Sequence, residues 1–110
     1  MLKYKLYLGD ILRAIEQIEK SLKGKDLIYF KKDFDVGEAT AMRMQIIGES
    51  IYKLPDDLKK KYNDVNWIRF VSFRNTISHA YFVVDKDMLW NAKDELPKLK
   101  RTVRRMLNEE

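Results

Sequence analysis

The segment RNTISHAY brings four side chains that could do chemistry within eight residues: Arg74, Asn75, His79 and Tyr81. His79 is the only histidine in the chain. Imidazole is the side chain whose ordinary pKa lets it give and take protons near neutral pH. A guanidinium such as that of Arg74 is always charged and can hold a phosphate through two hydrogen bonds. The cluster therefore suits proton transfer beside a bound anion, although a lone histidine is about as often a polar residue of a core or an interface.

Helix geometry decides which of these side chains can meet. Asn75 and His79 are four residues apart and share a helix face, so the amide could bond one ring nitrogen and fix the tautomer. Arg74 and His79 are five residues apart, which is about 140° around an ideal helix. They can converge if the helix ends near His79, or if a second copy of the motif faces the first across a two-fold axis.

Four segments have the apolar periodicity of helices, and none alternates convincingly as a strand does. The first covers 8–22 and stops at Gly24, because glycine readily takes the left-handed conformation that follows a helix. The second covers about 35–54, with Asp35 as a possible N-cap. Pro55 ends it, because the residue before a proline avoids the helical region.

The RNTISHAY cluster belongs to the third segment. A short helical turn over 56–62 is predicted to come first. The third helix then starts near Asp64, places Trp67, Ile68 and Val71 on one face, and continues into the cluster. The helix that carries the cluster is therefore expected to pack through the face of Trp67.

The fourth helix is predicted to begin after Asp85, a plausible N-cap, and to kink at Pro97. Its apolar positions, spaced three and four apart, are Leu89, Ala92, Leu96, Leu99, Val103 and Met106. This spacing is typical of nearly parallel or antiparallel helices in a bundle, and the apolar stretch 27–30 is too short and isolated to build a sheet. We therefore expect an all-α fold, with one domain over residues 1–110 built as an antiparallel four-helix bundle with a short extra helical turn.

The composition narrows the possible functions. The chain has no cysteine and one histidine, which excludes disulfides, thiolate chemistry and metal sites made of several histidines. Its longest apolar run, 80–84, is far below the ~20 residues that span a bilayer, and the N-terminus lacks the pattern of a signal peptide. We expect a soluble, cytoplasmic protein that uses neither a metal nor a cofactor.

RNTISHAY fits the pattern Arg-x4-His-x-Tyr, and on this motif the chain resembles the HepT-type toxins of the HEPN superfamily of small helical ribonucleases. The resemblance extends over nearly the whole chain. The other matching blocks are 10–18 in the first helix, 46–49 in the second, Trp67 before the motif, 81–85 and Trp90 after it, and 96–97 in the fourth helix. Ala80 departs from the pattern, since many relatives carry a polar or acidic residue there.

This resemblance implies an endoribonuclease toxin of a type VII toxin–antitoxin pair, cleaving RNA without a metal at a site assembled from two protomers of a homodimer. Arg74 and His79 would be the catalytic residues, and the 2′-hydroxyl of the RNA would be the nucleophile. The resemblance also implies that Tyr81 is adenylylated by a cognate minimal nucleotidyltransferase antitoxin, which blocks the site by charge and bulk. On the residues alone, Tyr81 is an amphipathic interface residue. Glu49 is a further candidate, either as a supporting acid or as a solvated carboxylate.

Two other functions fit part of the sequence. A non-catalytic helical subunit could present a substrate or nucleotide to a nucleotidyltransferase partner, with the motif as an interface. A plain nucleic-acid-binding domain would account for the net charge of +5, but not for the clustering of the motif residues. The basic residues gather at 59–61 and at Lys98, Lys100, Arg101, Arg104 and Arg105. Most such runs are solvated faces, yet they suit a polyanion.

Overall fold

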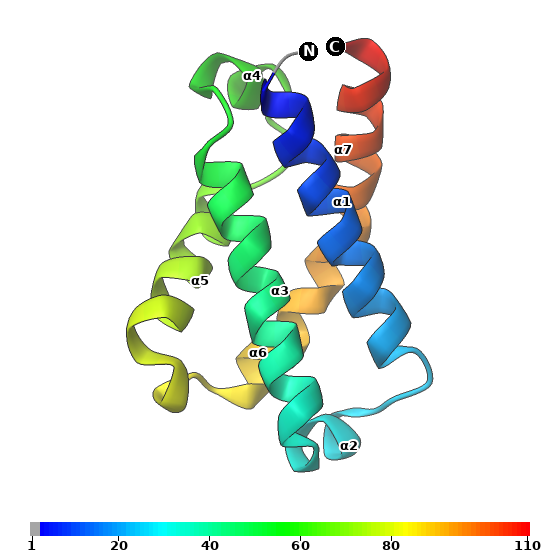
Figure 1. Ribbon diagram of the computed structural model, residues 1–110, viewed down its shortest axis with the longest axis vertical. Coiled ribbons are helices and arrows are strands. Elements are labelled where there is room, and N and C mark those ends of the chain that lie inside the picture. Colours follow the sequence, from blue (N-terminus) through cyan, green and yellow to red (C-terminus); the bar gives the residue numbers. More distant parts are fainter. Residues whose placement is uncertain (1–2) are drawn as a thin grey trace.

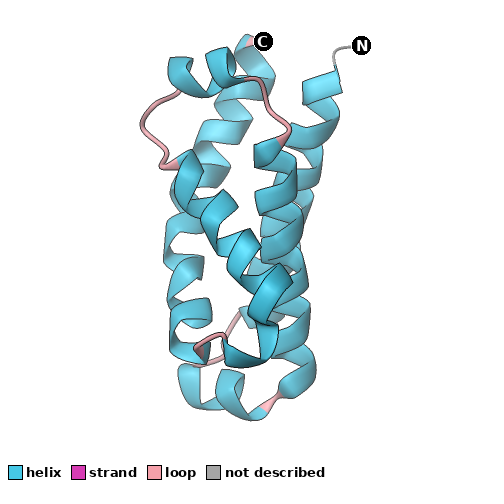
Figure 2. Ribbon diagram, turned by 90° about the vertical axis from the view of Figure 1, so that its left-hand side faces the viewer, coloured by secondary structure: helices cyan, strands magenta, loops and turns pink. Residues whose placement is uncertain are grey.

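The computed structural model describes residues 3–110 as a bundle of helices joined by short loops (Figures 1 and 2). The elements are α1 (Lys3–Leu22), α2 (Leu27–Lys32), α3 (Phe34–Tyr52), α4 (Asp56–Lys61), α5 (Trp67–Ala80), η1 (Tyr81–Val83), α6 (Lys86–Ala92), η2 (Lys93–Glu95) and α7 (Leu96–Glu109). Figure 1 shows α1, α3, α5 and the α6–α7 arm running alternately down and up, with both chain ends at the same end of the bundle. The prediction of an all-α, antiparallel bundle is confirmed.

Helix α3 lies at the centre of the bundle. It packs against α1 on one side and α5 on the other, while α7 packs against α1. The six apolar positions predicted for the fourth helix, from Leu89 to Met106, are all buried, and so are Ile11 and Ile15 of α1 and Ile47 of α3. The three-and-four spacing thus gives each helix an apolar stripe that meets the others in one core.

The N-terminal half contains a helix that the sequence pattern did not predict. The stretch 27–30 lies in α2, whose N-cap Asp26 accepts a hydrogen bond from the Tyr29 amide at 2.8 Å. The next helix begins earlier than expected, because Asp33 and not Asp35 is its N-cap. The Asp33 carboxylate accepts from the Val36 amide at 3.1 Å and from the Tyr29 hydroxyl at 2.9 Å. One carboxylate therefore ties α2 to the start of α3.

Helix α5 begins at Trp67 rather than near Asp64, because the Asn66 side chain caps it by accepting from the Arg69 amide at 3.2 Å. Trp67 is buried as predicted, but Ile68 is 77% exposed. On α3, Met42 and Ile46 are also exposed. Apolar side chains therefore remain on the outer surface of both α3 and α5.

The predicted fourth helix consists of two helices. Asp85 caps α6 as expected, accepting from the Asp87 amide at 2.8 Å. The chain then forms the short 3₁₀ turn η2 before α7 begins. The interruption of the α-helix therefore lies before Pro97. Proline has no N–H to bond the carbonyl of Lys93, and the Leu96 amide bonds that carbonyl instead. The kink that Pro97 predicted is therefore a break one turn before it.

The basic residues of α7 are mostly paired with acids. Lys100 contacts Glu19 at 2.7 Å, and Arg104 contacts Glu16 at 3.5 Å. In Figure 1, α7 lies on the opposite side of the bundle from α5. The α7 basic run is therefore a salt-bridged face remote from the RNTISHAY cluster. None of the helices in residues 3–110 combines the length and apolar character of a membrane span.

Candidate functional site

Helices α3 and α5 are in close contact, and the contact includes Arg74 of the motif. The two helices run antiparallel, so that residues of rising number on α3 meet residues of falling number on α5. The Gln45 amide donates to the Ser78 hydroxyl at 2.8 Å near one end, and Gly48 lies against Arg74 farther along. Tyr52 and Val71 follow near the other end, lining one pocket. Arg74 thus lies at the middle of the contact between α3 and α5.

The Arg74 guanidinium is held by three neighbours. Its Nη2 lies 2.8 Å from Glu49 Oε2, and its Nη1 donates to Asn75 Oδ1 at 2.8 Å. Its central carbon lies 5.4 Å from the centre of the Tyr52 ring, close enough for a cation–π contact. Its Nε is buried and has no hydrogen-bond partner within residues 3–110. Arg74 is therefore a cation that its neighbours hold in place.

Gly48 makes this placement of Arg74 possible. A Cβ atom built on Gly48 would lie 2.3 Å from Cβ of Arg74 and 2.8 Å from the Phe70 carbonyl oxygen. Real side chains do not approach so closely, so α3 and α5 can meet at this level only through a glycine. The close approach brings Glu49, the next residue of α3, to the guanidinium.

His79 lies in the last turn of α5 with its side chain exposed. It makes no hydrogen bond or ion pair in the described part of the chain, residues 3–110. The expected hydrogen bond between Asn75 and His79 is not formed among residues 3–110, where the Asn75 amide oxygen accepts from Arg74. The strong nearby guanidinium is the better partner for that oxygen.

Arg74 and His79 do not converge within one chain. Helix α5 stays helical through Ala80, so the two side chains keep the separation of an ideal helix, about 140° in direction and about 7.5 Å in rise. The helix does end near His79, at Ala80, but both residues still lie within it, so this helix end does not bring them together. A second copy of the motif is the route that stays open.

Tyr81 follows α5 in the turn η1 and is half-buried. Burial raises the pKa of its phenol, and the negative charge of Glu38 raises this pKa further. The ring packs edge-on to Phe82 with 5.3 Å between centres. Both line a pocket of about 420 Å³ together with Phe34 and Lys86. The Tyr81 hydroxyl therefore stays neutral, and the pocket beside it is lined by the positively charged Lys86.

Sequence reasoning missed two contributors to the site and underrated a third. Gln45 and Tyr52 were not singled out, and Glu49 was only a weak candidate. Together with Gly48 they form one stripe of α3 at spacings of three and four residues. This polar stripe, with a glycine inside a helix, is the signal that could have found them.

Comparison with known proteins finds relatives whose names include ribonuclease or RNase. The sequence model of a family described as "Ribonuclease HepT-like" matches residues 11–106. The "Probable ribonuclease HepT" of Thermococcus cleftensis is 35% identical over 98 residues, covering 88% of this chain and 89% of the relative. The "Gamma-glutamylcyclotransferase and putative RNase" of Methanocaldococcus jannaschii is 36% identical over 106 residues, covering 96% of this chain and 48% of the relative. This chain thus spans about half of the latter protein. No solved structure matches the chain significantly.

Proposed function

Since the chain belongs to the HepT-like ribonuclease family, we propose that it is a metal-independent endoribonuclease, the toxin of a type VII toxin–antitoxin pair that acts on RNA in the cytoplasm. The observation that carries the proposal is the presence of two side chains of complementary chemistry on α5. Arg74 is held in place at the contact between α3 and α5, and His79 is exposed and makes no competing contact within residues 3–110. These are the groups that cleavage of a phosphodiester needs.

The reaction follows from the chemistry of these groups. One imidazole takes the proton of a ribose 2′-hydroxyl, and the oxygen attacks the adjacent phosphorus. The bond from phosphorus to the 5′-oxygen then breaks, and the imidazole that took the first proton gives a proton to that oxygen. Arg74 holds the phosphate oxygens and stabilises the charge that develops on them. The products are a 2′,3′-cyclic phosphate and a 5′-hydroxyl.

A homodimer would complete the site. If two α5 helices cross antiparallel about a two-fold axis midway between the levels of Thr76 and Ile77, Arg74 of one copy lies level with the partner's His79, because both are equally far from the axis. Each dimer would then hold two such pairs. The exposed apolar side chains of Met42, Ile46 and Phe82, which flank the motif, support an interface on this side of the molecule.

Glu49 is assigned a positioning role. It holds Arg74 at 2.8 Å and also lies 3.7 Å from Lys53, so its charge is shared between two cations. In the free protein it occupies one edge of the guanidinium. Asn75 holds the opposite edge, so that together they orient Arg74 rather than His79.

Cleavage of RNA in EDTA, followed by analysis of the new ends, tests the proposal. We expect cyclic phosphate and 5′-hydroxyl ends, because the nucleophile is the substrate's own 2′-oxygen. A need for added Mg²⁺ would contradict the mechanism. RNA that binds the protein and stays intact would support the other candidate, a non-catalytic binding subunit of a nucleotidyltransferase.

Regulation is proposed to act through Tyr81. A minimal nucleotidyltransferase would catalyse attack of the phenol oxygen on the α-phosphorus of ATP, forming a phosphodiester to AMP and releasing pyrophosphate. The neutral phenol would give up its proton in this step to the released pyrophosphate. The added phosphate carries negative charge to a position beside the motif, where it would repel the phosphate of RNA. Lys86, in the same pocket, would partner the added phosphate.

Tyr81→Phe is expected to escape modification while still cleaving RNA, because the hydroxyl is the acceptor of AMP and has no part in the cleavage. Incubation with the partner enzyme and ATP should add AMP to the unchanged chain and none to the variant. Intact-mass spectrometry measures this directly. AMP found on another residue, or on the variant, would overturn the assignment to Tyr81.

A further inference from the structure

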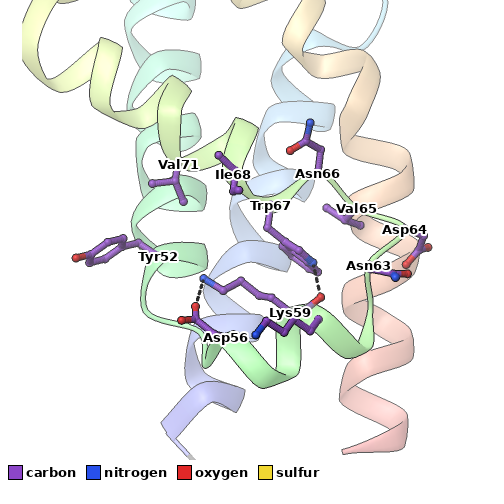
Figure 3. Close-up of a pocket in the computed structure, with 11 residues that line it drawn as sticks. Tyr52, Asp56, Lys59, Asn63, Asp64, Val65, Asn66, Trp67, Ile68 and Val71 are labelled. Carbon is purple, nitrogen blue, oxygen red and sulfur yellow. Dashed lines mark hydrogen bonds and ion pairs between the residues drawn. The ribbon is translucent and has the colours of Figure 1, made fainter.

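A pocket of about 720 Å³ opens between α4, the loop that follows it, and the first turns of α5 (Figure 3). Its volume is within the range of about 300–1,000 Å³ that is typical of small-molecule sites. Ile68 and Val71 line it on the α5 side, Tyr52 stands at its edge, and Trp67 lies in its middle. Neither the cleavage step nor the modification of Tyr81 uses this pocket.

Hydrogen bonds hold the pocket in shape. The Trp67 indole Nε1 donates to the carbonyl oxygens of Lys59 at 3.1 Å and Tyr62 at 2.9 Å. The Lys59 ammonium donates to the Ile51 carbonyl oxygen at 3.2 Å, which ties α4 to the end of α3. The pocket is therefore formed before any ligand arrives, and a ligand need not order it.

The charges around the pocket favour a ligand with acceptor groups. Its two carboxylates are already paired, Asp56 with Lys59 at 3.5 Å and Asp64 with Arg105 at 3.5 Å. Lys60, also in the lining, is exposed and makes no ion pair among residues 3–110. The pocket thus offers one uncommitted cation and no uncommitted acid. This balance of charges suits a nucleotide better than a basic peptide, which would need a free carboxylate, or a purely apolar peptide.

Tyr52 lies between the pocket and Arg74. The residue is 63% exposed and stands at the edge of the pocket, and its ring contacts the guanidinium. Val71, another lining residue, precedes Arg74 by about one helical turn, a rise of about 4.5 Å. A base attached to a sugar whose phosphate lies on Arg74 can therefore reach the pocket. Exposed aromatic rings are the usual platforms on which unpaired bases stack.

We propose that this pocket receives a base of the RNA strand next to the scissile phosphate. Tyr52 is the stacking platform, Ile68 is the apolar wall, and Lys60 and Asn63 at the rim contact the backbone or the base edge. The inference rests on the proposed ribonuclease function and adds a subsite that selects single-stranded RNA, because a base enters the pocket only when it is unpaired.

Binding of 2′-O-methyl RNA oligonucleotides, measured by fluorescence anisotropy, tests the subsite apart from catalysis, because their 2′-oxygen cannot attack. An abasic residue is placed at each position in turn. We expect one position at which the abasic residue weakens binding to the unchanged protein about tenfold, the size of one lost base stack. Tyr52→Ala should weaken binding of the intact strand about tenfold and be insensitive to that position, whereas Tyr52→Phe should bind normally.

Ile68→Ala and Ile28→Ala form a matched pair for this experiment. Both isoleucines are largely exposed, at 77% and 65%, but Ile28 lies on α2 at the other end of the bundle. Only Ile68→Ala is expected to weaken binding of the intact strand. Similar losses in the two variants would mean a general surface effect and would overturn the subsite.

Three further results would also overturn it. The first is an equal effect of Tyr52→Ala on intact and abasic strands, and the second is no effect on either. The third is loss of a dimer in Tyr52→Ala or Ile68→Ala by analytical ultracentrifugation, which would show that a second copy covers the pocket. Cleavage of unmodified RNA in EDTA separates the two proposals. Cleavage without base-dependent binding refutes the subsite alone, and base-dependent binding without cleavage refutes the enzyme alone.

Discussion

Replacing His79 by alanine is expected to slow RNA cleavage by about 10²–10⁴-fold, the usual contribution of a positioned proton transfer. The imidazole is the only group in the motif suited to exchange protons at neutral pH, so no neighbour can replace it. Its side chain is exposed and makes no hydrogen bond or ion pair within residues 3–110. The thermal midpoint should therefore stay unchanged. The rate is measured in EDTA on end-labelled RNA.

Ser72→Ala is the matched control for this change. Ser72 lies two helical turns before His79 on the same exposed face of α5, and it has no proposed part in the reaction. The control should cleave RNA at the unchanged rate. Normal activity in His79→Ala would contradict the mechanism, and an equal loss in Ser72→Ala would point to an interface rather than to chemistry.

Mixing two inactive variants tests whether the site is shared between protomers. Arg74→Ala and His79→Ala each disable both sites of their own homodimer. In a mixed dimer, one site keeps the intact Arg74 of one copy and the intact His79 of the other. Random exchange at equal amounts should therefore restore about a quarter of the normal activity. A mixture that stays inactive after exchange would contradict the shared site.

The sequence predicted those parts of the fold that depend on local physics. Gly24 was expected to follow the first helix, and its φ of 74° is a conformation that glycine takes without strain. Asp85 was expected to cap the last segment, and it does so. The three-and-four spacing of the fourth helix placed Leu99 and Val103 in the core, where both are fully buried. Caps and apolar stripes need only neighbouring residues, so they can be recognised without tertiary information.

Predictions that depended on partners from distant segments were less accurate. Periodicity placed Ile68 on an apolar face of its helix, but it could not show whether another helix covers that face. The bond expected between Asn75 and His79 is not formed, and the Asn75 oxygen accepts from Arg74, which Glu49 of α3 holds in place. Glu49 and Arg74 are far apart in the sequence, and nothing in the spacing of either helix indicates that they meet. The same holds for the roles of Gln45 and Tyr52.

Gly48→Ala is expected to impair both the stability and the activity of the protein. The new methyl group would lie 2.3 Å from Cβ of Arg74 and 2.8 Å from the Phe70 carbonyl oxygen. Neither atom is at the far end of a flexible side chain, so neither can move aside easily. Helices α3 and α5 must therefore separate, at a cost of about 1–3 kcal/mol for overpacking. The intrinsic helical gain from glycine to alanine, about 1 kcal/mol, offsets only part of this. Urea unfolding measures the difference.

The activity of Gly48→Ala should fall for a second reason. Moving α5 away from α3 breaks the short contact between Glu49 and Arg74, and a displacement of about 1 Å can cost a catalytic group roughly 10²-fold in rate. Gly9→Ala is the control, because Gly9 lies inside α1 with no atom within 4 Å of the new methyl group. That variant should gain stability from helix propensity and keep full activity. If Gly48→Ala were as stable and as active as Gly9→Ala, close packing of α3 against α5 would not be what positions Arg74.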